Sequence, residues 1–291
     1  MSFREALESD KFLVTAEIGP AKGTETGVLL EDASILRDRV DAINVTDMQS
    51  SVMRLGSVAV CHLLKDMGVD PVLQVTCRDR NRLALQSDLL SAWVLGVRNV
   101  LSLTGDHPTL GDHPHAKAVF DLDSVSLLEV IGKLNSGLDM AGSELKGATG
   151  FLPGAVVNPG ADTDAALDLQ IMKMEKKIEA GARFFQTQAI YDLDIFEKFM
   201  KRVEGYKTKV LGGVILLKSP GMARFMNKNV AGVFVPEHLI KAMADSKDKV
   251  KTSIEIAARL VKGMKDLCHG VHIMAIGWEK RVPQVLDEAG L

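Results

Sequence analysis

Apolar residues along the chain change repeatedly between two spacings. Short solid runs of Val, Ile and Leu, beginning with residues 12–20, alternate with longer segments in which apolar residues recur every three or four positions. Solid runs are typical of strands buried on both faces, and the wider spacing is typical of amphipathic helices. The pattern therefore predicts alternating strands and helices around a parallel sheet.

Eight strands and their helices can be placed in this way. We predict strands at residues 12–20, 41–46, 71–77, 97–104, 149–157, 183–188, 209–216 and 270–275. We predict helices at residues 25–40, 52–67, 81–95, 123–135, 162–180, 192–203 and 221–229. A loop at 105–122, a short apolar piece at 232–235, two further helices and a terminal helix from residue 279 complete the chain.

Eight βα units in 291 residues favour an α/β fold of the (β/α)8 TIM barrel type, as a single domain over residues 1–291. A doubly wound open sheet is the alternative. It would use fewer strands and would carry a glycine-rich phosphate turn after the first of them. No GxGxxG follows Ile18 and no GxxxxGK[ST] occurs in the chain, so the barrel is preferred.

The composition of the chain argues against nucleic acid and membranes as binding partners. The chain is 46% hydrophobic and 25% charged, as globular proteins are, and its net charge of −3 leaves no basic footprint for nucleic acid. No stretch approaches the roughly 18 apolar residues of a membrane span, and the acidic N-terminus is unlike a signal peptide. We expect no nucleic-acid or membrane partner and a cytoplasmic location.

The end of the first predicted strand carries a carboxylate, Glu17. It could lie where the strand frays, or it could cap the next helix. Parallel α/β folds place their chemistry at the carboxyl ends of strands, so Glu17 could equally be an active-site acid. Similar polar residues end the other predicted strands: Asn44, Thr46, Asp47, Thr76, Cys77, Arg78, Asp79, Thr104, Asp106, Asn158, Gln186, Thr187, Gln188, Trp278 and Glu279. Such a ring predicts a hydrogen-bonding surface for a planar heterocycle.

Gly105 stands between the end of the fourth strand and Asp106, and a glycine there lets a ligand approach the backbone closely. Asp106 could instead cap its own turn. The loop that follows holds His107, His113 and His115, which could indicate a metal site, although repeated Asp-His-Pro is also ordinary turn chemistry. Without a regular ligand spacing we predict no metal.

Two further groups of residues have two explanations each. Lys173, Lys176 and Lys177 could form a solvated helix face, or Lys173 and Lys177 could reach an anionic ligand one helical turn apart. Three cysteines are too few and too scattered for a disulfide framework. We interpret Cys61 and Cys268 as buried apolar residues, whereas Cys77 ends a strand and lines a potential site.

In their order and spacing these motifs resemble the methylenetetrahydrofolate reductases. The resemblance rests on TAEIGP around Glu17, NVTD around Thr46, Thr76-Cys77, LTGDHP around Asp106, FQTQ ending at Gln188, and GVFVP at 232–236. It covers nearly the whole chain and implies a flavoprotein with a (β/α)8 barrel. The activity implied is reversible reduction of 5,10-methylenetetrahydrofolate to 5-methyltetrahydrofolate.

The resemblance also implies roles for individual residues. Glu17 matches the general acid that protonates N10 of the substrate, Asp106 an aspartate near flavin and pterin, and Gln188 a pterin-binding glutamine. Residues matched to cofactor contacts are Thr46, Thr76, Cys77, Thr104, Gly105, Asp106, Phe120, Lys173 and Lys177.

Departures from the family pattern shape the cofactor and partner predictions. Gln74 stands where a histidine is usual, and the aromatic and histidine expected near residues 156–158 are missing, so FAD and FMN both stay open. The phenylalanine that stacks nicotinamide in NADH-using members falls near Pro220. The chain resembles the short form of the family, which implies an oligomer and an electron-donating partner subunit, an iron–sulfur or zinc protein.

Two alternatives remain at this point. One is a pterin-dependent methyltransferase on the same fold, which would need no flavin. The other is a flavin subunit that is active only within a larger redox complex. A tetrahydromethanopterin-type substrate also stays open, because the matched residues address only the pterin head.

Overall fold

The computed structural model describes residues 1–161 and 163–291. Over these residues eight parallel strands close into a barrel in sequence order, with β1 pairing β8. The strands are β1 (Leu13–Ile18), β2 (Ala42–Val45), β3 (Pro71–Thr76), β4 (Asn99–Leu103), β5 (Leu152–Val157), β6 (Phe184–Ala189), β7 (Lys209–Ile215) and β8 (Gly270–Met274). The predicted (β/α)8 barrel is confirmed.

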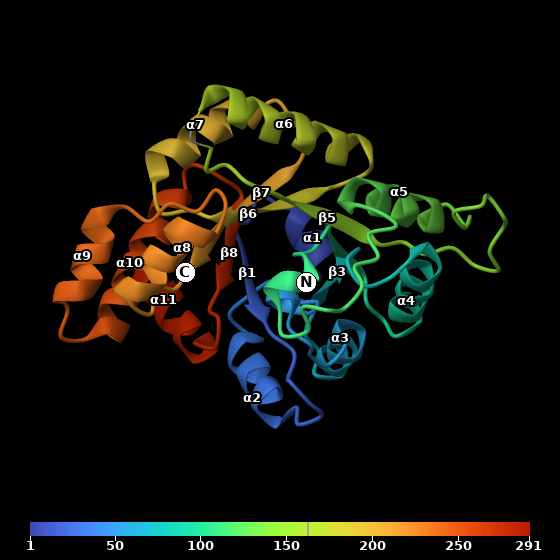
Figure 1. The fold of residues 1–291 in the computed structure, drawn as a ribbon, viewed down its shortest axis with the longest axis horizontal. Helices are drawn as coiled ribbons and strands as arrows, with labels where there is room; N and C mark the ends of the chain where they lie inside the picture. Colours follow the sequence, from blue (N-terminus) through green and yellow to red (C-terminus); the bar gives the residue numbers. More distant parts are fainter. Residues whose placement is uncertain (162) are drawn as a thin grey trace.

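Helices surround the barrel (Figure 1). They are α1 (Phe3–Glu8), α2 (Gly27–Leu36), α3 (Ser57–Asp66), α4 (Arg82–Val94), α5 (Ser124–Asn135), α6 (Asp164–Glu179), α7 (Leu193–Val203), α8 (Pro220–Asn229), α9 (Glu237–Asp245), α10 (Lys249–Met264) and α11 (Val282–Ala289). Short 3-10 helices are η1 (Gln49–Ser51), η2 (Pro108–Leu110) and η3 (Glu279–Arg281). No helix among the described residues is long and apolar enough to cross a bilayer.

Several ends differ from the predicted ones for local reasons. The predicted helix at 52–67 begins only at Ser57, because the strained turn containing η1 precedes it. The predicted helix start at residue 162 lies outside the described residues, and α6 has Thr163 as its N-cap. The apolar piece at 232–235 forms no strand; Asn227 holds it through two hydrogen bonds with the backbone of Val235.

The half of the barrel interior nearer the amino-terminal ends of the strands is apolar. Inward-facing side chains of seven strands form one cluster with α1: Leu13, Ala42, Val72, Leu101, Leu152, Phe184 and Leu211. Phe3 of α1 is fully buried there and meets Phe184 edge-on at 5.2 Å between ring centroids. Figure 1 shows α1 across the centre of the barrel. This helix therefore closes the amino-terminal end of the barrel and leaves the carboxyl ends of the strands as the side on which such folds bind ligands.

Candidate functional site

Above the apolar layer, the barrel interior becomes polar. Alternation along each strand turns Thr15, Asn44, Gln186 and His272 inward, and all four are buried. Asn44 and Gln186 exchange two amide hydrogen bonds, at 2.7 Å and 3.1 Å. Gln186 also donates to Thr15 Oγ1 at 3.2 Å, and Thr15 Oγ1 lies 2.9 Å from His272 Nδ1. These bonds satisfy buried polar groups and tie β1, β2, β6 and β8 together.

Glu17 lies directly above this layer and is 9% exposed. Its Oε2 accepts from Gln74 Nε2 at 3.0 Å, and its Oε1 accepts from Gln49 Nε2 at 3.2 Å. His272 Nε2 is 3.7 Å from Oε2. Glu17 therefore neither frays into solvent nor caps α2, whose N-cap is Thr26. A buried carboxyl among neutral donors at a barrel mouth is suited to holding and giving a proton.

Gly105 and Asp106 follow β4 as predicted, but the Asp106 carboxylate does not cap its own turn. No described residue donates a hydrogen bond to that carboxylate, which is exposed. Gly105 has φ +92°, and a Cβ there would lie 3.0 Å from Thr76 Cβ. The structure thus requires glycine where the chain crosses the end of β3, and it leaves Asp106 free to meet a ligand.

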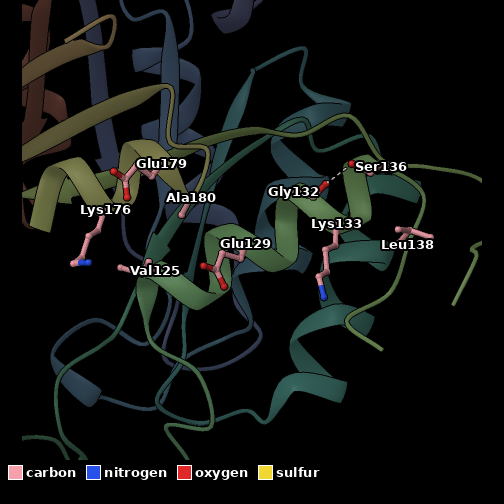
Figure 2. Close-up of a pocket in the computed structure, with 9 residues that line it drawn as sticks. All are labelled: Val125, Glu129, Gly132, Lys133, Ser136, Leu138, Lys176, Glu179 and Ala180. Carbon is pink, nitrogen blue, oxygen red and sulfur yellow. Dashed lines mark hydrogen bonds between the residues drawn. The ribbon is translucent and has the colours of Figure 1, made fainter. Parts of the chain in front are cut away.

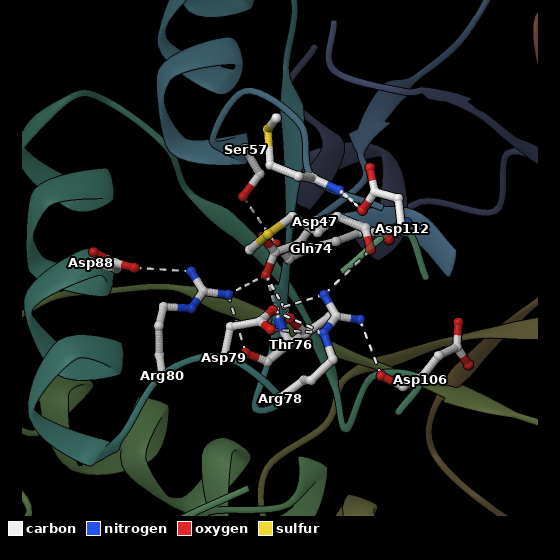
Figure 3. Close-up of polar contacts among 12 residues, drawn as sticks. Asp47, Ser57, Gln74, Thr76, Arg78, Asp79, Arg80, Asp88, Asp106 and Asp112 are labelled. Carbon is white, nitrogen blue, oxygen red and sulfur yellow. Dashed lines mark hydrogen bonds and ion pairs between the residues drawn. The ribbon is translucent and has the colours of Figure 1, made fainter. Parts of the chain in front are cut away.

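Arg78, a fully buried side chain, fixes the backbone around Asp106 (Figure 3). Its Nη1 donates to the Asp106 carbonyl and its Nη2 to the Met48 carbonyl, each at 3.3 Å. Its charge is balanced by Asp79, which accepts from Nη2 at 2.7 Å. Arg78 therefore joins the loops after β2, β3 and β4, because one planar guanidinium has donors for all three.

Thr46, Thr76 and Cys77 differ in what they can offer a cofactor. Thr46 is buried, and within the described part of the chain its Oγ1 has no hydrogen-bond partner. Thr76 donates through both N and Oγ1 to Asp47, which also pairs with Arg80. Cys77 lies in the hydrophobic core, and burial raises the pKa of its thiol to about 12. The prediction that the Cys77 side chain lines the site is therefore wrong; only its backbone reaches the strand end.

The basic residues of α6 divide into two environments. Lys173 and Lys176 are exposed, but Lys177 is partly buried and donates to the Val156 carbonyl of β5 at 2.7 Å. Burial and the neighbouring charge of Lys173 lower the pKa of Lys177 to about 8. Neither Lys173 nor Lys177 forms an ion pair with a described carboxylate. A solvated helix face is thus the wrong explanation for Lys177, whose ammonium lies against β5.

Gln188 lies within a shift in the pairing of β6 with β7, which falls between Gln186 and Ala189. Thr187 fills this gap: its Oγ1 accepts from Gly213 N at 2.8 Å and donates to the Gln188 carbonyl at 2.7 Å. The Gln188 Oε1 accepts from Ala189 N at 3.1 Å. Such irregularities re-aim side chains next to active sites, and this one leaves the Gln188 amide nitrogen available at the mouth.

The loop after β4 shows ordinary turn chemistry at its histidines. His107 Nδ1 caps η2 by accepting from Thr109 N, and its ring stacks on Phe120 at 6.2 Å. His113 pairs with Asp112 at 2.8 Å. Thr104 Oγ1 accepts from Ser124 N at the start of α5. Among the described residues, no group of three His, Cys, Asp or Glu is placed to hold a metal ion.

Glu17, Asp106 and Gln188 thus all lie at the carboxyl end of the barrel, on β1, after β4 and on β6, without direct contact among them. The contacts of Gln49 and His272 with Glu17 were not predicted from the sequence. His272 lies inside a strand run that otherwise reads as apolar, and this buried polar residue is the signal that could have found it.

Two open grooves lie away from the mouth. One of about 590 Å3 runs between α5 and α6, with Glu129, Lys133, Lys176 and Glu179 on its walls (Figure 2). The other, of about 700 Å3, follows the outer face of α4. Both are on the outer helical layer, so neither belongs to the polar interior described above.

A family model described as methylenetetrahydrofolate reductase matches residues 2–290. The chain belongs to this family. The resemblance drawn from the sequence motifs is therefore confirmed. Methylenetetrahydrofolate reductase 2 of Schizosaccharomyces pombe is 24% identical over 235 residues, which cover 75% of this chain and 35% of the relative. A probable methylenetetrahydrofolate reductase (NADPH) of Caenorhabditis elegans is 25% identical over 262 residues, covering 86% and 36%.

A bacterial relative is also similar to this member of the family. The 5,10-methylenetetrahydrofolate reductase of Pectobacterium carotovorum is 27% identical over 150 residues, which cover 51% of this chain and 44% of the relative. The chain therefore spans less than half the length of these three relatives.

Solved structures support the fold. An uncharacterized protein from Clostridium thermocellum, which binds two copies of 5-methyl-5,6,7,8-tetrahydrofolic acid, superposes with a TM-score of 0.64 at 14% identity, covering 99% of this chain and 98% of that chain. A 2,3-dimethylmalate lyase superposes with a TM-score of 0.56 at 11% identity, covering 99% and 85%. At these identities the likeness concerns the barrel alone.

Proposed function

We propose that residues 1–291 form one flavin-binding reductase domain that interconverts 5,10-methylenetetrahydrofolate and 5-methyltetrahydrofolate. The observation that carries the proposal is the buried carboxyl of Glu17 at the mouth of the barrel, in a chain of this family. The neighbour that binds 5-methyltetrahydrofolate adds support, since it is built on the same barrel.

The chain's residues fit a flavin with a phosphate-bearing tail. Thr46 offers a buried hydroxyl without a partner among the described residues, and Lys177 and Lys173 offer cationic charge that forms no ion pair with a described carboxylate. Gly105 has no side chain where the loop after β4 passes the end of β3, and Phe120 lies in the same loop. A bound flavin, FAD or FMN, would supply the hydride that reduces the methylene carbon.

Glu17 would act on the substrate as a general acid. In the reductive direction its carboxyl gives a proton to N10 of methylenetetrahydrofolate, so that the five-membered ring opens and the methylene carbon becomes electrophilic. Gln188 would hold the pterin through its amide nitrogen, and the Asp106 carboxylate, to which no described residue donates, would accept from the same ring system. In the reverse direction Glu17 takes the proton back.

Substitution of the acid tests this function. We expect Glu17→Gln to retain the flavin and to lose about 10²–10⁴-fold in reduction of methylenetetrahydrofolate with a reduced artificial dye as donor. Glu129→Gln on the exposed face of α5 is the matched control and should keep the parent rate. Turnover of Glu17→Gln at the parent rate would refute the assignment.

Two alternative functions predict different results for the purified protein. Protein that releases no flavin on denaturation, yet transfers a methyl group from 5-methyltetrahydrofolate, would favour a pterin-dependent methyltransferase. Activity that requires an added iron–sulfur or zinc subunit would favour a flavin subunit of a larger redox oligomer, which the position of Pro220 also supports. A cytoplasmic location stays a prediction.

A further inference from the structure

The side chain of Gln74 is buried in the barrel interior and has the Glu17 carboxyl as its partner. Gln74 lies on β3, is 7% exposed and donates from Nε2 to Glu17 Oε2 at 3.0 Å. Its backbone is held as well, because its carbonyl accepts from the Ser57 hydroxyl at 3.4 Å (Figure 3). A buried amide on a rigid strand is an accurate support for a reacting group, since it cannot move away into solvent.

The other contacts of Glu17 are weaker supports. Gln49 donates at 3.2 Å but is exposed and lies in η1, where Ser50 and Ser51 have positive φ. His272 Nε2 is 3.7 Å from Oε2, beyond hydrogen-bond distance, and its Nδ1 is engaged with Thr15. Gln74 is therefore the one described residue that is both buried and hydrogen-bonded to the carboxyl.

We propose that Gln74 is the positioning residue of Glu17 and that its amide holds the carboxyl in both protonation states. The proposal rests on the function above, in which Glu17 gives and regains a proton. The amide donates through Nε2 to the carboxylate and, turned over, accepts through Oε1 from the carboxylic acid. Neither a lysine nor an arginine could do both, because those side chains only donate.

Few charged groups lie close enough to the Glu17 carboxyl to compete with the Gln74 amide. Of the titratable groups on elements that pack against β1, His272 of β8 is the one described within 4.0 Å of the Glu17 carboxyl. Asp47, past the end of β2, forms an ion pair with Arg80 and accepts a hydrogen bond from Thr76. Asp32 of α2 and Glu279 of η3 interact with each other outside the barrel, where burial and Glu279 raise the pKa of Asp32.

Substitutions of Gln74 should change the pH at which Glu17 holds its proton. The bond to the carboxylate is about twice as strong as the bond to the neutral acid, so Gln74→Leu removes more support from the ionised form. We expect the midpoint of the Glu17 titration to move up by about one pH unit. Isosteric Gln74→Glu should move it further in the same direction, because two facing carboxyls share one proton.

Infrared titration reads this proton directly and does not depend on turnover. The carboxyl band of Glu17 is identified as the band lost in Glu17→Gln, and its midpoint is followed in the flavin-loaded parent, Gln74→Leu and Gln74→Glu. Gln86→Leu is the control. It removes a glutamine of α4 that bonds to the Arg82 carbonyl and to Met140 N on the outer helical layer, and the Glu17 midpoint in this variant should stay at the parent value.

Kinetics give the second readout. Gln74→Leu should lower kcat about tenfold, keep KM within about threefold, and shift the alkaline limb of the pH profile with the infrared midpoint. A midpoint in both Gln74 variants equal to that of the parent would overturn the proposal. If Gln74→Leu fails to fold, Gln74→Glu decides it. A parent that shows the band but does not reduce methylenetetrahydrofolate would contradict the proposed function and leave the test of Gln74 intact.

Discussion

Lys177 should give the flavin-free protein a characteristic dependence of stability on pH. Its ammonium is partly buried on α6, beside the charge of Lys173. These two causes lower its pKa from the ordinary 10.5 to about 8. In the unfolded chain the same group keeps its proton up to pH 10.5. The folded state is therefore penalised below pH 8, where it must carry the charge, and is relieved of that penalty as the pH rises.

The size of the effect follows from linkage. A difference of about 2.5 units in pKa corresponds to roughly 3 kcal/mol over the whole window from pH 8 to 10.5. Between pH 7 and 9 the relief amounts to about 1 kcal/mol. Lys177→Met lacks the titrating group, so the free energy of unfolding of the parent should rise by this amount relative to the variant. Burial also raises the pKa of the Cys77 thiol, which works in the opposite direction, and comparison with the variant removes this contribution.

Urea unfolding of the flavin-free parent and of Lys177→Met at pH 7, 8 and 9 measures the difference. Lys176→Met, at an exposed position on the same helix, should follow the parent. With flavin bound, the difference in unfolding free energy between the parent and Lys177→Met should not change with pH. A phosphate beside Lys177 favours the charged form and restores its pKa. A constant difference between parent and Lys177→Met from pH 7 to 9 in the flavin-free protein would refute the reasoning.

Two further predictions concern stability. Gly105→Ala places a Cβ 3.0 Å from Thr76 Cβ at φ +92° and should destabilise the protein by about 1–3 kcal/mol in urea unfolding, whereas Gly132→Ala, within α5 and free of neighbours within 4 Å, should stabilise it by about 0.5–1 kcal/mol. Phe3→Ala removes a fully buried ring from its contact with Phe184 and should lower the unfolding free energy by about 3–5 kcal/mol; a change below 1 kcal/mol would show that α1 does not close the barrel.

The barrel could be predicted from the sequence because its strands are buried on both faces. Solid apolar runs then stand out against helical spacing, and each of the eight predicted strands overlaps an observed one. α1 was not placed, since six residues are too few to show a helical period, although Ser2 and Glu5 form a capping box there. η1 was missed because Met48, Ser50 and Ser51 adopt positive φ without a glycine to indicate it.

The site could be predicted only in part. Residues just past a strand, such as Glu17 and Asp106, are visible in sequence because a polar group interrupts an apolar run. Partnerships such as Gln74 with Glu17 are not, because they depend on which side chains turn inward and on the register across neighbouring strands. Cys77 was misplaced for the same reason. It ends a strand, but alternation turns its side chain toward the helices.

The polar layer explains how the two carboxylates of the site can differ in their surroundings. Barrel interiors are usually filled by branched apolar side chains, and a buried amide without a partner costs about 1–3 kcal/mol. Asn44, Gln186 and Thr15 avoid this cost only because closure of the barrel brings their strands together. Glu17 rests on that layer, so its position is set by the register of the strands. The backbone of Asp106 is held by Arg78, so changes in the loop after β4 should move Asp106 and leave Glu17 in place.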